Sequence, residues 1–337
     1  MANLVISERC NLACSYCFAS DYLDGHHGDI ARHSSPFIDL ETFENWLDFL
    51  DRSNIDEIRL IGGEPSLHPH FQEILHRAMR RGKHILVFTH GLLSEGALAS
   101  LEALPLDQVT VLVNMNASRH LHGPSPKENA RRRETLLRLG GRVQLGFTIC
   151  QPDFSLDYLL PLILETGCQK SVRLGIAQPV LGGRNQYLHP KQYINAGRRL
   201  VGWAERAGRE GVWLEFDCGF VRCMFSETDL ERLRQAGAGI AYRCNPILDI
   251  GLNEKALHCF PLAGTFHTEL KLTLTAGELR AILVEKVRPY RLAGIYKECT
   301  ICRYKQSGEC MGGCLAATIR RFQPAKININ IYGGEND

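Results

Sequence analysis

The sequence predicts an α/β fold in which six βα units form a parallel sheet, followed by a smaller cysteine-rich domain. In the first half of the chain, short β-branched runs alternate with amphipathic helical stretches. Beyond Gly175 this rhythm changes, and eight of the 13 cysteines follow residue 217. A chain of 337 residues is long enough for one large α/β domain and a smaller appendage.

The first half holds the alternating elements. We expect strands at residues 4–7, 57–61, 84–88, 108–114, 144–149 and 171–176. We expect helices at residues 40–52, 69–81, 94–103, 127–139 and 156–166. Asp39, Ser94 and Ser155 precede three of these helices, where their side chains can accept hydrogen bonds from the first turn.

The second half begins with a predicted helix at 191–209 and a strand at 212–216. Ser226 and Thr275 are expected to start two further helices, the second with the spacing of a capping box. Cys244 and Cys259 flank a predicted hairpin, which would bring their thiols together. We therefore divide the chain into residues 1–210, residues 211–322 and a polar C-terminal tail, 323–337.

Composition narrows the class of protein. The formal net charge of +2 gives no field strong enough to imply nucleic acid or a membrane surface. Neither a signal peptide nor a long apolar span is present in the sequence, so we expect a cytoplasmic protein. Cytosolic thiols are kept reduced, and clustered cysteines in such a chain indicate metal ligands rather than disulfides.

Three cysteines follow the first predicted strand: Cys10, Cys14 and Cys17. Loops at this edge of a parallel sheet commonly carry the chemistry of α/β enzymes. Three thiolates so close in sequence can hold a cubane iron-sulfur cluster and leave one iron open for a substrate. The alternatives are buried thiols or a zinc site, for which His26 or His27 could supply a fourth ligand.

The spacing Cys-x3-Cys-x2-Cys, with Tyr16 before the third cysteine, resembles the signature of the radical S-adenosylmethionine (SAM) superfamily. Gly62, Gly63, Glu64 and Pro65 follow the second strand, where that family carries its GGE motif. The resemblance implies a partial (β/α)6 barrel with one catalytic 4Fe-4S cluster on the three cysteines. It also implies reductive cleavage of SAM to a 5′-deoxyadenosyl radical, which abstracts hydrogen from a substrate.

Polar residues at strand ends are candidates for contacts to SAM, because barrel strand ends host functional groups. These candidates are Asn114, Thr148 and Arg173, together with Thr89, His90 and Asn116. Each could equally cap local backbone. His90 stands where the family often has asparagine, which weakens any transfer of function at that position.

The C-terminal cysteines form a CxxC followed by a CxxxC, from Cys299 to Cys314, preceded by Cys244 and Cys259. Together they resemble the SPASM extension, an α+β domain that binds auxiliary 4Fe-4S clusters in many radical SAM enzymes. Carried over by motif, one cluster takes Cys244, Cys259 and Cys314, and a second takes Cys299, Cys302 and Cys310. Two cysteines of the SPASM pattern are absent from their places here, and Cys218 and Cys223 are the available substitutes.

Two auxiliary clusters are favoured over one, although Cys218 and Cys223 could also be buried, inert thiols. Cys150 and Cys168 are expected in the core. Arg131, Arg132 and Arg133 are expected on a solvated helix face.

The sequence leaves three functions open. The SPASM resemblance favours a peptide- or protein-modifying oxidoreductase that performs crosslinking, thioether formation, epimerisation or oxidation, with the auxiliary clusters handling the electron. The alternative is a small-molecule dehydrogenase or carbon-skeleton enzyme of natural-product or cofactor biosynthesis. Either would need a reducing partner such as flavodoxin or ferredoxin. A non-enzymatic iron-sulfur or zinc scaffold is a third reading.

Overall fold

A computed structural model describes residues 1–19, 35–116 and 126–323. The described strands are β1 (Ala2–Ser7), β2 (Glu57–Gly62), β3 (His84–Thr89), β4 (Val109–Asn114), β5 (Val143–Ile149), β6 (Ser171–Ile176), β7 (Trp213–Phe216), β8 (Leu248–Ile250), β9 (Lys255–Leu257) and β10 (His267–Glu269). The described α-helices are α2 (Leu40–Arg52), α3 (Phe71–Arg80), α4 (Glu95–Glu102), α5 (Pro126–Leu139), α6 (Leu159–Thr166), α7 (Tyr193–Arg209), α8 (Glu227–Gln235), α9 (Ala276–Val287), α10 (Arg303–Gln306) and α11 (Leu315–Phe322). Short 3-10 helices lie among them, including η1 (Pro65–Leu67), η4 (Arg222–Met224), η6 (Arg288–Leu292) and η7 (Lys297–Thr300).

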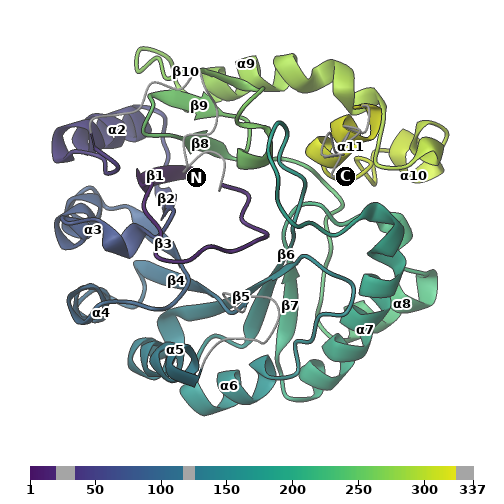
Figure 1. The fold of residues 1–337 in the computed structure, drawn as a ribbon, viewed down its shortest axis with the longest axis horizontal. Coiled ribbons are helices and arrows are strands. Elements are labelled where there is room, and N and C mark those ends of the chain that lie inside the picture. The colour runs from purple at the N-terminus through teal and green to yellow at the C-terminus, as the bar shows by residue number, and fades with distance from the viewer. Residues whose placement is uncertain (20–34, 117–125, 324–337) are drawn as a thin grey trace, which may run out of the picture.

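All ten described strands form one sheet, in the order β10-β9-β8-β1-β2-β3-β4-β5-β6-β7. Strands β1 to β7 pair in parallel with their neighbours, as repeated βα units require. Figure 1 shows these strands curving around a central space with helices α2 to α8 on the outside. The prediction of a parallel α/β partial barrel followed by a cysteine-rich region is confirmed.

The cysteine-rich region joins the same sheet. β8 pairs in parallel with β1, and β9 and β10 add antiparallel strands beyond it. The β8–β9 pair is the hairpin predicted between Cys244 and Cys259. The sheet therefore runs continuously past residue 210, and the division of the chain at that point stays a prediction.

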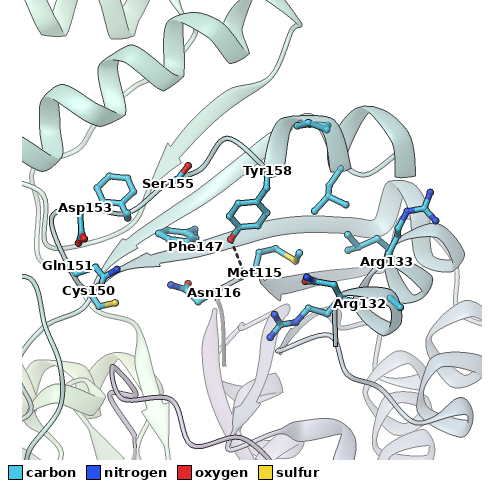
Figure 2. A pocket seen from close by; sticks show the side chains of 16 residues that line it. Met115, Asn116, Arg132, Arg133, Phe147, Cys150, Gln151, Asp153, Ser155 and Tyr158 are labelled. Carbon is cyan, nitrogen blue, oxygen red and sulfur yellow. Dashed lines mark hydrogen bonds between the residues drawn. The ribbon is translucent and has the colours of Figure 1, made fainter. Parts of the chain in front are cut away.

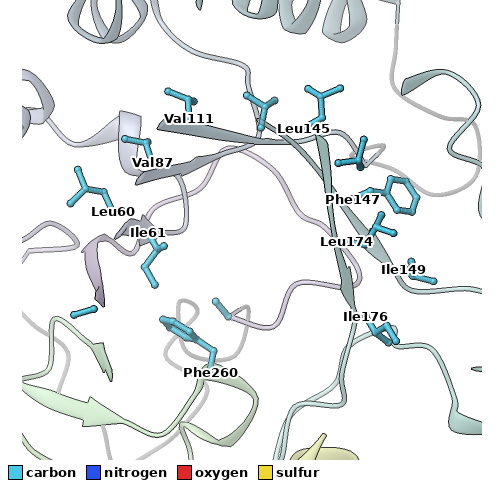
Figure 3. Packing of buried hydrophobic residues seen from close by; sticks show 14 of the residues in the cluster. Leu60, Ile61, Val87, Val111, Leu145, Phe147, Ile149, Leu174, Ile176 and Phe260 are labelled. Carbon is cyan, nitrogen blue, oxygen red and sulfur yellow. The ribbon is translucent and has the colours of Figure 1, made fainter. Parts of the chain in front are cut away.

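The core lies between the sheet and its outer helices. Leu60, Val87, Val111, Leu145 and Leu174 come from five consecutive strands and are almost fully buried (Figure 3). Strands with buried side chains on both faces read as continuous apolar runs, which is why the sequence located them well.

The helix boundaries follow local capping chemistry. Asp39 and Ser94 accept hydrogen bonds from first-turn N–H groups, and Ser226 and Thr275 begin helices, as predicted. Both form capping boxes, which the sequence indicated for Thr275 alone. The prediction for Ser155 is wrong. α6 begins four residues later, after Tyr158, because the Ser155 hydroxyl accepts from the Asp157 N–H in a local turn at 3.2 Å. Among the described residues, no helix is long and apolar enough to cross a membrane.

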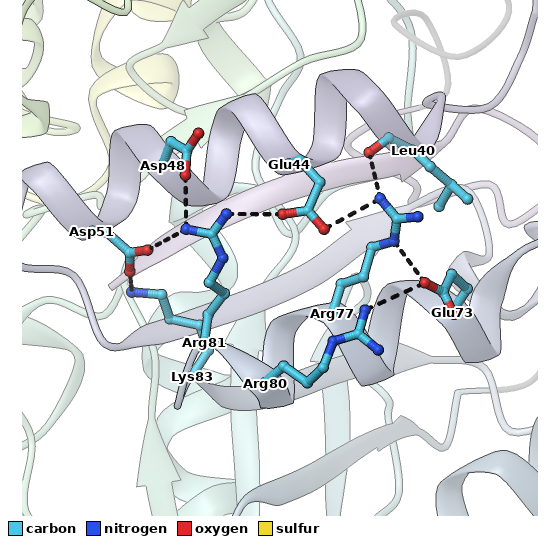
Figure 4. A network of polar contacts seen from close by, with 9 residues as sticks. All are labelled: Leu40, Glu44, Asp48, Asp51, Glu73, Arg77, Arg80, Arg81 and Lys83. Atoms are coloured by element: carbon cyan, nitrogen blue, oxygen red, sulfur yellow. Dashed lines mark hydrogen bonds and ion pairs between the residues drawn. The ribbon is translucent and has the colours of Figure 1, made fainter.

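An ion-pair network joins α2 to α3 on the outside of the barrel (Figure 4). Arg81 bridges Glu44, Asp48 and Asp51 of α2 at 2.7–3.0 Å. Lys83, which is 2% exposed, pairs with Asp51 at 2.5 Å and donates to the Ile55 carbonyl. A network with a buried member fixes helix position better than isolated surface pairs do. The role of this network is therefore to stabilise the fold.

Candidate active site

Cys10, Cys14 and Cys17 lie in the loop that follows β1, at the carboxyl end of the parallel strands. The Cys17 N–H donates to the Cys14 carbonyl at 3.0 Å, so a tight turn sets the spacing of these two residues. Burial raises the pKa of the Cys10 and Cys14 thiols, an effect that a bound cation reverses because metal ligands bind as thiolates. His26 and His27, the alternative zinc ligands, lie outside the described residues.

The Gly62–Gly63 pair holds this loop in place. The Gly63 N–H donates to the Ser7 carbonyl at 2.8 Å, and the Glu64 N–H donates to the Arg9 carbonyl at 2.7 Å. A Cβ on Gly62 would lie 2.0 Å from the Ser7 oxygen, and one on Gly63 would lie 2.3 Å from the Arg9 oxygen. Only glycine permits this approach. The motif thus ties the end of β2 to the backbone that leads into Cys10.

The Glu64 carboxylate is buried and held by protein groups. It accepts from the Ser66 hydroxyl at 2.6 Å, the Thr89 hydroxyl at 2.9 Å and the His90 N–H at 3.0 Å. Pro65 follows as the first residue of η1. Buried carboxylates need such partners, and here they fix the turn between β2 and η1.

His90 connects this turn to the cysteine loop. Its Nε2 lies 3.2 Å from the Glu64 carboxylate and 2.6 Å from the Asn11 side-chain oxygen. Burial lowers the pKa of His90, so the neutral imidazole with its proton on Nε2 suits this geometry. His90 therefore links the turn after β3 to Asn11, the residue after Cys10.

Two of the predicted SAM contacts meet at the ends of β4 and β5. The Asn114 amide lies 3.4 Å from the Thr148 hydroxyl. Asn116 binds the Thr148 backbone on both sides, donating to its carbonyl at 2.9 Å and accepting from its N–H at 2.7 Å. Asn116 therefore clamps two strand ends, and the contacts of Asn114 and Thr148 to SAM stay predictions.

Arg173 lies on β6 and reaches across the concave side of the sheet. Its guanidinium carbon lies 5.3 Å from the ring centroid of Phe88 on β3. In the sheet, β4 and β5 lie between β3 and β6. It also pairs with Asp217, which follows β7, at 2.8 Å. In the sheet register Arg173 lies opposite Gly146 of β5, which lies opposite Asn114 of β4, and a contact of Arg173 to SAM stays a prediction.

Arg132 is a residue that sequence reasoning missed. It was expected on a solvated face, but it is 1% exposed, and that prediction is wrong. Its Nε donates to the His90 carbonyl at 2.9 Å, while its buried Nη1 has no hydrogen-bond partner in the part of the chain that the structure describes. Helical periodicity could have indicated this burial, because Arg132 lies one turn before Leu136 on the buried face of α5.

A cavity of about 720 Å³ opens beside Arg132 at the ends of β4 and β5. Figure 2 shows Asn116, Cys150 and Tyr158 around it, with the Arg132 guanidinium extending from α5. Cys150 is buried, as predicted, and packs with Tyr16 of the cysteine loop. The cavity therefore borders the three-cysteine loop.

The buried charge of Arg132 indicates which part of SAM could bind beside the cysteine loop. A buried guanidinium is unfavourable unless an anion pairs with it. Its positive charge opposes the rise in the pKa of Cys14 and of Tyr16, so it acts on the cysteine loop. A carboxylate bound beside that loop would satisfy Nη1, and the methionyl end of SAM carries one.

The C-terminal cysteines fall into two groups of four. The first quartet is Cys218, Cys244, Cys259 and Cys314. Burial raises the pKa of Cys259 well above its usual value, and the thiols of Cys314, Cys244 and Cys218 raise it further. Cys218 has accessible surface on one side, yet burial and then Asp217, Cys314 and Cys244 raise its pKa.

The second quartet is Cys223, Cys299, Cys302 and Cys310. Burial raises the pKa of Cys223 to about 11, and the other three thiols add to the rise. A group of thiols that raises the pKa of Cys223 in this way suits a bound cationic cluster, which takes four thiolates. Among residues 1–19, 35–116 and 126–323, no three His, Cys, Asp or Glu side chains converge closely enough to hold a single metal ion.

The comparisons with known proteins agree with this geometry. A family model described as the Radical SAM superfamily matches residues 4–158. An S-adenosylmethionine-dependent nucleotide dehydratase of Selenomonas ruminantium is 37% identical over 26% of this chain and 29% of its own length. A GTP 3′,8-cyclase of Mycobacterium sp. (strain KMS) is 25% identical over 57% of this chain and 55% of its own length. The chain thus matches little more than half the length of these curated relatives, or less.

Solved structures extend the likeness of fold beyond the barrel. Streptococcus suis SuiB bound to S-adenosylmethionine has a TM-score of 0.65 at 15% identity, covering 96% of this chain and 75% of SuiB. anSMEcpe with bound AdoMet has a TM-score of 0.62 at 16% identity, covering 93% of this chain and 88% of anSMEcpe. The family match begins within β1 and takes in both the three-cysteine loop and the glycine turn that holds it, so residues 4–158 form a domain of the radical SAM superfamily.

Proposed function

We propose that this radical SAM enzyme abstracts hydrogen from a peptide or protein substrate, with auxiliary 4Fe-4S clusters handling the electron. One observation carries the use of SAM: the buried Nη1 of Arg132 has no hydrogen-bond partner among the described residues, and Arg132 acts on the loop that carries Cys10, Cys14 and Cys17. When bound, the cluster and SAM supply one-electron reductive cleavage of a carbon–sulfur bond.

The chain's own residues have distinct roles in this proposal. Cys10, Cys14 and Cys17 ligate the catalytic cluster as thiolates and leave one iron free. Gly62 and Gly63 keep the loop against the end of β2. Arg132 neutralises the SAM carboxylate, and this fixes the orientation of the cofactor relative to the barrel.

The two quartets support two auxiliary clusters, each with four thiolate ligands. Cys218 completes the first set and Cys223 completes the second. Full ligation suits clusters that transfer electrons, because neither leaves an iron open to substrate. Cys218 of the first quartet follows Asp217, which pairs with Arg173 of the barrel strand β6. The cluster of this quartet would therefore be the one nearer to a substrate in the barrel.

The peptide substrate is supported by the solved structures with the same fold. SuiB was solved with precursor peptide SuiA, and anSMEcpe with Kp18Cys peptide. These likenesses cover 96% and 93% of the chain and so include the cysteine-rich region.

A small-molecule substrate is the second candidate. The names of the curated relatives favour it, because they include a nucleotide dehydratase and GTP 3′,8-cyclases. These matches cover 26% and 57% of the chain, so they give little information about the cysteine-rich region.

The test is formation of 5′-deoxyadenosine by anaerobically reconstituted protein with SAM and dithionite. We expect the product with wild-type protein and none with the Cys10, Cys14 and Cys17 triple alanine variant. The same product from both proteins would contradict the proposal. Stimulation of this reaction by unmodified peptides encoded beside the gene, and not by GTP or other nucleotides, would support the peptide substrate. The reverse pattern would support the small-molecule candidate.

A further inference from the structure

Tyr193 is a fully buried tyrosine to which the proposed function gives no role. It is the first residue of α7, and its side chain is 0% exposed. Its hydroxyl oxygen accepts a hydrogen bond from Nε2 of Gln178, a buried residue that follows β6, at 3.3 Å. Because the amide donates, the hydroxyl proton of Tyr193 is left to point elsewhere, and no group among the described residues accepts it.

The Gln178–Tyr193 pair therefore has unused hydrogen-bonding capacity in a buried place. Besides the hydroxyl proton of Tyr193, Oε1 of Gln178 is buried and has no hydrogen-bond partner in the described part of the chain. A buried donor without an acceptor costs free energy, which an acceptor on a bound group would recover. The pair is thus suited to a ligand that presents an acceptor atom to the hydroxyl.

The pair lies against the segment that supplies Cys218 of the first quartet. A Cβ on Gly219, the residue after Cys218, would lie 2.6 Å from Nε2 of Gln178. One turn along α7 from Tyr193, a Cβ on Gly197 would lie 2.5 Å from the carbonyl oxygen of Met224 in η4. Both contacts hold the Tyr193 end of α7 against residues 218–224.

The electrostatic surroundings of the hydroxyl agree with this position. Burial raises the pKa of Tyr193, and Cys314, Tyr296 and Cys218 raise it further. Two of these three groups are thiols of the first quartet. The third, the Tyr296 hydroxyl, donates its own proton to the Pro190 carbonyl at 2.6 Å. Tyr193 therefore remains a neutral hydrogen-bond donor beside the sulfur atoms of the first quartet.

We propose that Tyr193, oriented by Gln178, donates a hydrogen bond to a sulfur atom of the 4Fe-4S cluster on the first quartet and so raises the reduction potential of that cluster. Hydrogen bonds to cluster sulfur stabilise the reduced form, which carries more negative charge. This inference rests on the proposed function, because it needs a cluster on the first quartet. Its consequence is that the cluster nearer to a substrate accepts an electron more readily than it would without the hydroxyl.

The test is a potentiometric titration of the reconstituted full-length protein, followed by electron paramagnetic resonance. Cys218→Ala identifies the signal of the first-quartet cluster, and Tyr193→Phe removes the hydroxyl while it keeps the buried ring. At a fixed potential, we expect the ratio of reduced to oxidised first-quartet cluster to fall about tenfold in Tyr193→Phe. For a one-electron couple this corresponds to a potential lower by about 59 mV.

Tyr296→Phe is the matched control. It also removes a hydroxyl close to the quartets, but one whose proton is already bound to the Pro190 carbonyl. The ratio for the first-quartet cluster should stay within about twofold of the wild-type value. Electron–nuclear double resonance in H2O and D2O adds a direct readout. The reduced first-quartet cluster should couple to an exchangeable proton in the wild type and in Tyr296→Phe, and this coupling should be lost in Tyr193→Phe.

An unchanged ratio in Tyr193→Phe with full iron content would overturn the proposal, as would an equal fall in Tyr296→Phe. If Tyr193→Phe loses iron, the wild-type protein decides, and a first-quartet cluster with no coupled exchangeable proton overturns the proposal. Wild-type protein that holds no cluster on the first quartet would contradict the proposed clusters, and this inference with them. A cluster that is present but insensitive to Tyr193 would contradict this inference alone.

Discussion

Cys218 and Cys223 lie five positions apart in the chain, yet their thiols belong to different groups. Cys218 lies with Cys244, Cys259 and Cys314, whereas Cys223 lies with Cys299, Cys302 and Cys310. Cys310 and Cys314 divide in the same way. Two short segments, 218–223 and 310–314, therefore each supply one thiol to the first quartet and another to the second. The two metal centres would therefore be neighbours, held by shared loops.

This division predicts that Cys218→Ala and Cys223→Ala perturb different auxiliary clusters. Each variant should lose or labilise about four irons, because each cluster loses one of four thiolate ligands. Electron paramagnetic resonance of the reduced proteins should show a different auxiliary signal affected in each. Cys168→Ala is the control, since Cys168 is buried and contacts the Thr166 hydroxyl. Loss of the same signal in both variants would refute the division.

The contact between Gly63 and Arg9 predicts a specific sensitivity of the catalytic cluster. In Gly63→Ala the new Cβ would lie 2.3 Å from the Arg9 carbonyl oxygen, so the segment leading into Cys10 must move. We expect loss of about four irons and of SAM cleavage. Gly96→Ala is the matched control on α4, because a Cβ there meets no atom within 4 Å and alanine favours the helix. Full iron content and activity in Gly63→Ala would contradict this account of the motif.

The buried Nη1 of Arg132, which has no hydrogen-bond partner within the described ranges, predicts a defect in SAM binding when this residue is replaced. Arg132→Met should raise the dissociation constant for SAM about tenfold or more, because a buried charge-assisted hydrogen bond is lost. Arg133→Met is the control, since Arg133 is half-exposed and pairs with Glu165. Calorimetric titration of SAM into the oxidised, reconstituted proteins measures both. An unchanged affinity in Arg132→Met would show that another anion satisfies this residue.

Asp249 on β8 predicts a pH dependence of stability. Its carboxyl is buried and accepts from the Asn3 amide at 2.5 Å, and burial raises its pKa to about 7. An unfolded Asp ionises near its usual pKa of 3.8, so the stabilising contribution of protonated Asp249 is complete below that pH and is lost as pH rises to about 7. The total loss is on the order of 4 kcal/mol.

Asp249→Asn removes this penalty. We expect its melting temperature to exceed that of the wild type by more at pH 8 than at pH 6, measured on reconstituted protein. Asp107→Asn, at an exposed site, should shift neither value. A destabilised Asp249→Asn protein at pH 8 would mean that the ionised carboxylate is itself needed there.

Much of the fold could be predicted because local chemistry determines it. The apolar runs of β2 to β6 and the caps at Asp39, Ser94 and Thr275 act over a few residues, and each appears where the sequence indicated. The pairing of β8 with β1 could not be predicted, since it joins residues about 246 positions apart through backbone hydrogen bonds that leave no mark on side-chain type.

The site divides in the same way. The three-cysteine loop and the glycine turn are short motifs, so the sequence shows them directly. The assignment of Cys218 and Cys223 to separate quartets and the burial of Arg132 depend on how distant segments pack. The predicted tail, 323–337, lies outside the described residues from position 324 onward.

The most direct test of one catalytic and two auxiliary clusters is the iron and sulfide content of anaerobically reconstituted protein, with Mössbauer spectra, for the wild type and the Cys10, Cys14 and Cys17 triple alanine variant. We predict about twelve irons falling to about eight, all in four-iron clusters. About eight irons falling to about four would contradict the second auxiliary cluster, and iron content unaffected by the triple substitution would contradict the catalytic cluster itself.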